Sequence, residues 1–225
     1  MRALKTAVII PAAGTSSRMG ADKQRLLLDG KPVLAHTLEA FNSHEGIDEI
    51  ILVGKDKEIA KGFSKVSTIV EGGENRQSSV WAGLCALRRR DGDIDRVLVH
   101  DGARPLVSHS IISDVLQKML KSGCAVSGVR SKDTIKITDA DNIVMDTPAR
   151  ENMWLVQTPQ AFPYSILVEA HKKAIADGFE GTDDAVLVER MGIPVEMVEA
   201  CYSNIKLTTA EDLLIAEAYI KQRNT

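Results

Sequence analysis

Two cations stand in a loop of small residues near the start of the sequence. Ala12–Gly14 follow the first apolar run, and Arg18 and Lys23 come next. Small side chains let backbone N–H groups approach a ligand closely, while Arg and Lys bind phosphate oxygens. The loop has neither the G-x-G-x-x-G of a dinucleotide site nor the G-x-x-x-x-G-K-[ST] of a P-loop. It therefore predicts another kind of phosphate site, with a plain loop carrying two solvated cations as the alternative.

An acidic and a basic residue follow a later apolar run, in the segment "VHDGARP". Asp101 comes two residues after Val99, where a strand is predicted to end, and Arg104 follows Asp101. A carboxylate at the carboxyl end of a parallel strand suits a Mg²⁺ that accompanies a nucleoside triphosphate. Arg104 could then meet a second anionic group. The residues alone give equal weight to an Asp–Arg pair that braces the loop.

Two further segments carry polar groups that could bind a ligand. The segment 70–84 places Gly73, Glu74 and Ser79 where they could bond a base, although a helix-start loop is favoured when the segment is read alone. Lys206 lies between a strand end and a helix, where a lone Lys is usually a solvated charge. The five histidines have no metal-ligand spacing, and no nucleophile–His–acid arrangement is visible.

The bulk composition excludes several classes of protein. The net charge of −3 over 225 residues gives no basic field for nucleic acid. No apolar run is long enough to span a bilayer, so no membrane partner is predicted. The cysteines, Cys85, Cys124 and Cys201, are far apart, which argues against zinc and a disulfide framework. Reduced thiols and the lack of room for a signal peptide favour a cytoplasmic location.

Short apolar runs alternate with amphipathic stretches along most of the chain. Strands are predicted over 7–10, 49–53, 67–70, 96–99, 125–129 and 193–198. Helices are predicted over 33–42, 56–63, 76–89, 110–121, 165–177, 183–191 and 210–222. Thr182 and Thr209 are the predicted N-caps of the last two helices. This alternation predicts an α/β protein with a mostly parallel, doubly wound sheet, whose ligands lie beyond the carboxyl ends of the strands.

One segment, 133–162, interrupts the alternation because it has no helical period. "TIKIT" and "NIVMDT" favour two strands around an "ADN" turn. A hairpin inserted in an α/β domain would form an exposed arm, at about 134–156, and an isolated hairpin is only marginally stable. Such an arm is expected to pack on another subunit. Without a shift in composition or a repeat, one domain is predicted over 1–225.

Taken together, these segments resemble the 2-C-methyl-D-erythritol 4-phosphate cytidylyltransferase family of the non-mevalonate isoprenoid pathway. The opening motif alone is shared by many sugar nucleotidyltransferases, but the later segments narrow the resemblance. They run in order over nearly the whole chain: PAAG-x-x-x-R-M with Lys23, GG-x-x-R-x-x-S-V, HDGARP, Asp133-Thr134, R-x-x-x-W-x-x-QTPQ, GTDDA and NIKLTT-x-EDL.

The resemblance implies a Rossmann-like three-layer α/β/α sandwich with a protruding β-arm that builds a homodimer. It implies that the phosphate of methylerythritol phosphate attacks the α-phosphorus of CTP and that pyrophosphate leaves. The expected cofactor is Mg²⁺. One departure is Arg25, which stands where the family is expected to have an aromatic residue, so its role is left open between phosphate and solvent.

The resemblance also implies a role for individual residues. Backbone contacts to CTP are expected from Ala12, Ala13 and Gly14. Recognition of cytosine is expected from Gly73, Glu74 and Ser79. Charge at the reacting phosphates is expected to be stabilised by Arg18, Lys23 and Lys206. Mg²⁺ and substrate are expected at Asp101. Methylerythritol phosphate is expected to be held by Arg104, Thr134, Arg150 and Thr158, with Thr134 and Arg150 supplied by the partner's arm.

Three alternatives to this function remain. The nearest is a ribitol-5-phosphate cytidylyltransferase, which shares the fold, CTP and most motifs. A non-catalytic nucleotide-binding regulatory module belongs to another class, and the cations expected at an α-phosphate argue against it. An NAD-dependent oxidoreductase is disfavoured by the missing G-x-G-x-x-G.

Overall fold

A seven-stranded sheet forms the centre of the computed structural model, which describes residues 4–14, 24–88 and 94–223. The strand order is β11-β7-β10-β6-β1-β4-β5. All neighbours pair in parallel except β10, which is antiparallel to both β6 and β7. The strands are β1 (Lys5–Pro11), β4 (Glu49–Val53), β5 (Val66–Val70), β6 (Ile94–Val99), β7 (Ala125–Arg130), β10 (Trp154–Pro163) and β11 (Glu196–Glu199).

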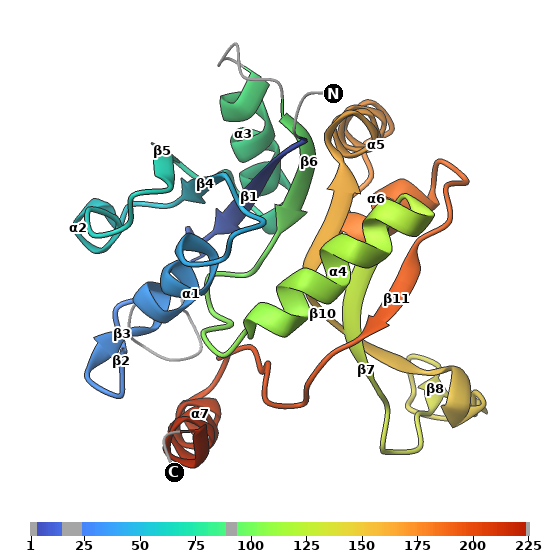
Figure 1. Cartoon of the computed structure of the whole chain (residues 1–225). Coiled ribbons are helices and arrows are strands. Elements are labelled where there is room, and N and C mark those ends of the chain that lie inside the picture. The colour runs from blue at the N-terminus through green and yellow to red at the C-terminus, as the bar shows by residue number, and fades with distance from the viewer. Residues whose placement is uncertain (1–3, 15–23, 89–93, 224–225) are drawn as a thin grey trace.

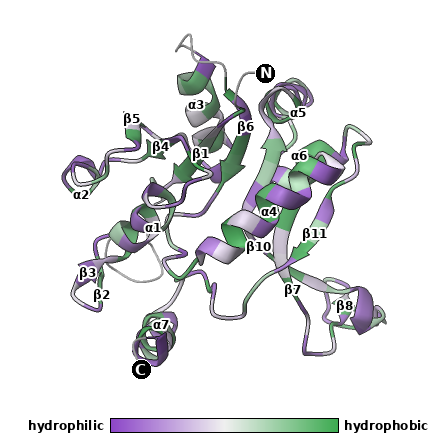
Figure 2. Cartoon of the chain, viewed as in Figure 1, coloured by the Kyte–Doolittle hydropathy of each residue, from purple (hydrophilic) through white to green (hydrophobic). Residues whose placement is uncertain are grey.

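Helices cover both faces of this sheet, and the strands between them carry mostly hydrophobic residues (Figures 1 and 2). The helices are α1 (Val33–Asn42), α2 (Lys57–Ala60), α3 (Arg76–Arg88), α4 (His109–Ser122), α5 (Tyr164–Ala176), α6 (Asp184–Glu189), α7 (Ala210–Arg223) and the 3-10 helix η1 (Arg150–Asn152). Within the described ranges, no helix is long and apolar enough to cross a membrane.

Side chains of β1 alternate between two hydrophobic cores. Val8 and Ile10 pack in a cluster with residues of α1 and α4. Ala7 and Ile9 pack in a second cluster with residues of α3, α5 and α6. All four side chains are fully buried, as the continuous apolar run in the sequence predicts for a strand covered on both faces. The predicted three-layer α/β/α fold is therefore confirmed, whereas the single domain over 1–225 stays a prediction.

The central antiparallel strand β10 is the main element that the sequence pattern failed to predict. Its first residues, from Trp154, fall inside the segment predicted as arm, and the strand continues into the middle of the sheet. The arm hairpin itself is smaller and consists of β8 (Ile137–Thr138) and β9 (Val144–Asp146). Three of the six consecutive buried residues of β10 are polar, so its burial is invisible to a hydrophobicity pattern: Gln157, Thr158 and Gln160.

Two smaller predictions about helices are corrected, one at a cap and one in length. Asp183, and not Thr182, caps α6, because its carboxylate accepts a hydrogen bond from Val186 N at 3.0 Å. The predicted helix over 56–63 is reduced to the four residues of α2. Thr209 does cap α7, since its Oγ1 accepts from Asp212 N at 3.4 Å. Asp and Thr side chains compete for the same role at a helix start, and the sequence does not show which one is chosen.

Candidate active site

The loops that follow β1, β5 and β6 contact one another at the carboxyl edge of the sheet. Gly102 N, after β6, donates to Pro11 O at the end of β1, at 3.1 Å. On the other side, a Cβ on Gly72 would lie only 2.2 Å from the Cβ of Ala13. A residue with a side chain at position 72 would therefore push these loops apart, which explains the small residues at both positions.

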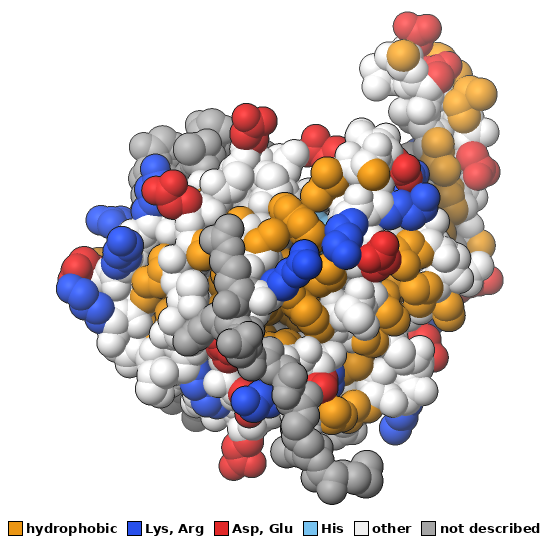
Figure 3. Space-filling view, turned by 90° about the horizontal axis from the view of Figure 1, so that it is seen from above, with side chains coloured by type: hydrophobic (Ala, Val, Ile, Leu, Met, Phe, Trp, Pro, Cys, Tyr) orange, Lys and Arg blue, Asp and Glu red, His pale blue; other side chains and the backbone are white. Residues whose placement is uncertain are grey.

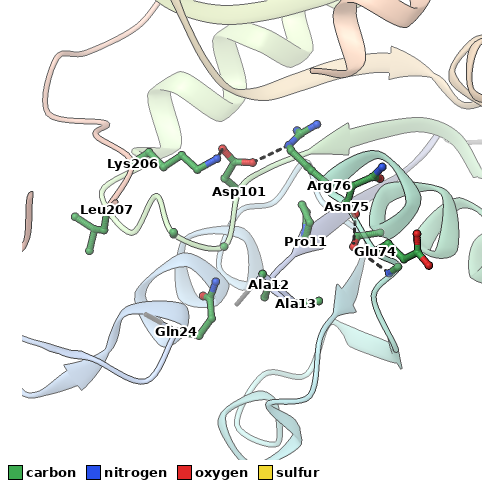
Figure 4. A pocket seen from close by; sticks show the side chains of 15 residues that line it. Pro11, Ala12, Ala13, Gln24, Glu74, Asn75, Arg76, Asp101, Lys206 and Leu207 are labelled. Carbon is green, nitrogen blue, oxygen red and sulfur yellow. Dashed lines mark hydrogen bonds and ion pairs between the residues drawn. The ribbon is translucent and has the colours of Figure 1, made fainter. Parts of the chain in front are cut away.

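A cavity of about 410 Å³ opens between these loops (Figure 4). The residues predicted to contact the nucleotide meet here although they come from distant parts of the sequence. The predicted site residues that line the cavity are Ala12, Ala13, Gly14, Gly73, Glu74, Ser79, Asp101 and Lys206. Arg18 and Lys23 lie outside the described residues, so the structure gives no position for them.

The loop before α3 lines the cavity and also begins the helix. Ser79 is buried, and its hydroxyl accepts from Gly73 N at 3.1 Å and donates to Asn75 O at 2.9 Å. Asn75 Oδ1 in turn accepts from Ser78 N at 2.8 Å. The helix-start interpretation and the ligand-binding interpretation are thus compatible, because the hydroxyl of Ser79 holds the loop while Gly73 and Glu74 face the cavity.

Asp101 is the electrostatic centre of the cavity wall. Figure 4 shows its carboxylate between Arg76 and Lys206, which bind it at 3.1 Å and 3.0 Å. Arg104 Nε lies 3.5 Å from the same carboxylate. Burial raises the pKa of Asp101, but the three cations together hold it well below its usual range. Asp101 is therefore ionised at neutral pH and fixes three positive charges around it.

A buried chain of hydrogen bonds holds the backbone of Asp101. Its N–H donates to Thr158 Oγ1 at 3.0 Å, and Thr158 Oγ1 lies 3.1 Å from His100 Nδ1. His100 Nε2 lies 3.2 Å from Arg104 O. Burial lowers the pKa of His100 to about 4, so the ring is neutral and donates through Nε2 to the carbonyl while Nδ1 accepts. His100 therefore has a structural role in this loop, and the hydroxyl of Thr158 is committed to this chain of hydrogen bonds.

A second cavity, of about 260 Å³, lies on the other side of the charged wall. Arg76, Asp101 and Lys206 line both cavities, and Arg104 and Thr158 line only the second. Here β10 loses its regular pairing with β7 between Val156 and Gln160. Gln157 and Thr158, which lie in this irregular stretch, line the smaller cavity. The arrangement can hold two anionic ligands against one row of cations.

Thr134 and Arg150, the two substrate-binding residues predicted on the arm, do not line either cavity in this chain. Arg150 lines a separate hollow of about 380 Å³ with Arg130, Ser131 and Glu151. Its guanidinium donates to Lys132 O at 3.3 Å. Thr134 is exposed and lines none of the three cavities described. Their predicted contact with substrate therefore needs a second subunit.

Two residues of the site were not predicted from the sequence. Arg76 and Asp184 form an ion pair of 2.7 Å behind Asp101. A usable signal was the position of Arg76 at the start of α3, where the helix dipole disfavours a cation and partners are needed. Arg25 binds the buried carboxylate of Asp56 at 2.7 Å, which gives it a structural partner after the opening loop.

The described residues contain no group of three or more His, Cys, Asp or Glu side chains that could hold a metal ion by itself. Mg²⁺ in nucleotide sites is bound by one or two carboxylates together with substrate phosphates. The carboxylate of Asp101 is shared by both cavities, and an ion of that kind bound to it would compete with the three cations that already contact its oxygens.

Comparison with known proteins agrees with this geometry. The family model for 2-C-methyl-D-erythritol 4-phosphate cytidylyltransferase matches residues 6–222. A protein of that name from Geotalea uraniireducens is 46% identical over 99% of both chains. One from Desulforamulus reducens is 44% identical over 96% of both chains.

Solved structures give the same result. The 4-diphosphocytidyl-2C-methyl-D-erythritol synthase of Anaerococcus prevotii matches with a TM-score of 0.87 at 34% identity, covering 97% of this chain and 99% of that chain. The 2-C-methyl-D-erythritol 4-phosphate cytidylyltransferase of Thermus thermophilus matches with a TM-score of 0.79 at 35% identity, covering 97% and 100%. The resemblance seen in the motifs is confirmed, and the chain belongs to the 2-C-methyl-D-erythritol 4-phosphate cytidylyltransferase family.

Proposed function

We propose that this protein transfers CMP from CTP to 2-C-methyl-D-erythritol 4-phosphate. A phosphate oxygen of the alcohol phosphate attacks the α-phosphorus of CTP, and the bond from that phosphorus to the bridging oxygen breaks. Pyrophosphate leaves with the electron pair, and 4-diphosphocytidyl-2-C-methyl-D-erythritol is formed. The observation that carries the proposal is the cationic wall shared by two cavities in a chain of this family.

The larger cavity suits the nucleotide. Backbone groups of Ala12–Gly14 and Gly73 line it, and Glu74 is available to bond a base. The smaller cavity suits the alcohol phosphate, because Arg104 offers a cation on its side of the wall. With the nucleotide and the alcohol phosphate in these two cavities, the attacking oxygen and the α-phosphorus would meet at Arg76, Asp101 and Lys206.

The chemistry demands positioning more than proton transfer. The attacking phosphate is already an anionic nucleophile, and pyrophosphate is a good leaving group. The main obstacle is repulsion between anions, which fixed positive charge offsets. Lys206 meets this need directly, since Asp101 holds its ammonium at the wall with a 3.0 Å ion pair. Arg18 and Lys23 are proposed to add charge from the opening loop.

Mg²⁺ is the proposed cofactor, and Asp101 is the residue that would hold it. When bound with the nucleotide, the ion supplies positive charge to the phosphates. The residues that line the two cavities must then bind both substrates and keep Asp101 ionised.

A homodimer is proposed through the arm. In Figure 3 the arm projects from the body on the right, with hydrophobic side chains among acidic ones. Large apolar side chains of the hairpin are exposed: Ile137, Ile143, Val144 and Met145. A hairpin of this size gains stability by packing on another surface. The dimer would bring Thr134 and Arg150 to the partner's smaller cavity, and a cytoplasmic location is proposed with it.

The decisive experiment follows pyrophosphate release by the purified protein with CTP, Mg²⁺ and one alcohol phosphate at a time. Release with methylerythritol phosphate is expected. Release with ribitol 5-phosphate alone would transfer the assignment to that substrate. Calorimetric binding of CTP without turnover on any polyol phosphate would instead indicate a regulatory module.

A further inference from the structure

A chain of ionisable side chains leads from the cavity wall into the protein interior. Arg76 Nη1 donates to Asp184 Oδ2 at 2.7 Å, and His171 Nε2 donates to Asp184 Oδ1 at 3.0 Å. Asp184 is 1% exposed and His171 is 0% exposed. Neither residue lines either cavity, so the proposed reaction gives them no direct task. Buried charges are rarely kept without a partner or a use.

Arg76 is held by two carboxylates that fix the plane of its guanidinium. Nε binds Asp101 at 3.1 Å, and Nη1 binds Asp184. The third nitrogen, Nη2, is buried and has no hydrogen-bond partner among the described residues. Arg76 lines both cavities, so a ligand oxygen placed there would supply the partner that this donor lacks.

Asp184 is anchored independently of Arg76. Its backbone N donates to Gln160 Oε1 on β10 at 3.2 Å. The ring of His171 is stacked on Trp81 of α3, with 6.1 Å between centroids and 16° between planes. Burial raises the pKa of Asp184, but Arg76 and His171 lower it below its ordinary value, so it is an ionised acceptor. Anchors on β10, α5 and α3 therefore set the position of Arg76 from behind.

The charges at the wall also favour an anion. Three cations, Arg76, Arg104 and Lys206, line the smaller cavity with two carboxylates, Asp101 and Asp183, which leaves one net positive charge there. We propose that His171 and Asp184 are positioning residues that hold Arg76 so that its Nη2 binds a phosphoryl oxygen of a substrate. This inference rests on the proposed function and assigns a further binding residue to the same site.

The test compares the steady-state kinetics of three variants and one control variant with those of the wild type. Arg76→Gln keeps part of the side-chain volume but removes the fork. We expect its kcat/KM to fall about tenfold or more, because a charge-assisted hydrogen bond is lost. Separate KM values for CTP and for the alcohol phosphate identify which phosphoryl group binds, and calorimetric titration with CTP gives a readout without turnover.

His171→Leu and His171→Gln test the positioning role. A leucine side chain at position 171 lacks the N–H group that donates to Asp184, whereas a glutamine side chain keeps an N–H donor of similar reach. We expect His171→Leu to shift the same KM or kcat as Arg76→Gln, by a smaller factor, and His171→Gln to recover most of the loss. A purely structural role would lower the melting temperature in both variants without this kinetic pattern.

Arg190→Gln is the matched control, since Arg190 follows α6, pairs with Asp177 at the surface and lines neither cavity. It should keep wild-type kinetics. Wild-type kinetics in folded Arg76→Gln would overturn the proposal even if His171→Leu fails to fold. Absence of turnover in the wild type would instead refute the proposed function, and the CTP titration would still test Arg76.

Discussion

The cavity wall and the arm use charged residues in opposite ways. At the wall, Asp101 and Asp184 are buried, and each binds a cation within the same chain. On the arm, Arg150 is exposed, and its guanidinium donates to the backbone carbonyl of Lys132 without a carboxylate partner among the described residues. The wall is assembled by one chain alone, whereas the arm presents its groups outward. In the proposed function, one subunit supplies the wall that binds the nucleotide, and the arm of a second subunit completes the alcohol-phosphate side.

This difference also determines how each region responds to substitution. Removing one member of a buried ion pair leaves the other charge without its partner. Removing an exposed charge leaves only solvent in its place. Substitutions at the wall should therefore affect both substrates, and substitutions on the arm should affect one substrate or the dimer.

The largest effect is expected for Asp101→Ala. Arg76, Arg104 and Lys206 would lose the carboxylate that fixes them, so the charge at the reacting phosphates would be misplaced. Pyrophosphate release should fall by about 10²-fold or more. Asp177→Ala, which breaks a surface pair, is the control and should retain activity. A folded Asp101→Ala enzyme with activity near that of wild type would contradict the role of the wall.

A pH effect on stability is expected from His100. Its pKa lies near 4 in the folded protein and near 6.5 when unfolded, so between these values the unfolded state binds more protons. The free energy of unfolding should fall by up to about 3 kcal/mol as the pH drops from 6.5 to 4. Denaturant unfolding at several pH values measures this slope. In His100→Gln the slope should be smaller, and an unchanged slope would count against the buried neutral ring.

Arg150→Ala should affect one substrate only. Its KM for the alcohol phosphate should rise about tenfold, as expected for a lost charge-assisted hydrogen bond, with little change in the KM for CTP. Mixing Lys23→Ala and Arg150→Ala subunits should restore part of the activity, because one of the two sites in a mixed dimer would contain both wild-type residues. Mixed dimers as inactive as either parent would exclude a role across the interface.

The change with the smallest direct effect on the active site is Met145→Asp, because it lies at the most exposed large apolar position of the arm and acts on the dimer. Burying a new charge in the proposed interface should weaken dimerisation by about tenfold or more, as judged by sedimentation. The unfolding of the separate subunits should change little. Leu120→Asp, an exposed position on α4, is the matched control. Equal dimer strength in both variants would place the interface elsewhere.

Most of the architecture was predictable because the parallel strands are continuous apolar runs. The strand of Glu49–Val53 and the helix of Val33–Asn42 were predicted with their observed ends. β10 was missed because Gln157, Thr158 and Gln160 are buried through hydrogen bonds, which leave no hydrophobic pattern.

The site was predictable to the extent that each motif follows a strand. Asp101, Gly73 and Ala12 share the edge where carboxyl ends meet, so topology brings them together. The ion pair of Arg76 with Asp184 joins residues 108 positions apart, and the position of Arg76 at a helix start signals only that it needs a partner, not which residue that is. A pairing of this kind can be recognised only when α3, α5, α6 and β10 are seen packed together.

The path of β10 has a consequence for changes in chain length. This strand carries the end of the arm at Trp154, the wall of the smaller cavity at Thr158 and the start of α5 beyond Pro163. An insertion or deletion within it would shift the arm, the substrate pocket and a helix by one register step. The turn at 139–143, exposed at the tip of the arm, has no such constraint. Natural length variation, and any inserted tag, should therefore disturb the fold of the subunit less at that tip than in β10, although it would alter the proposed dimer interface.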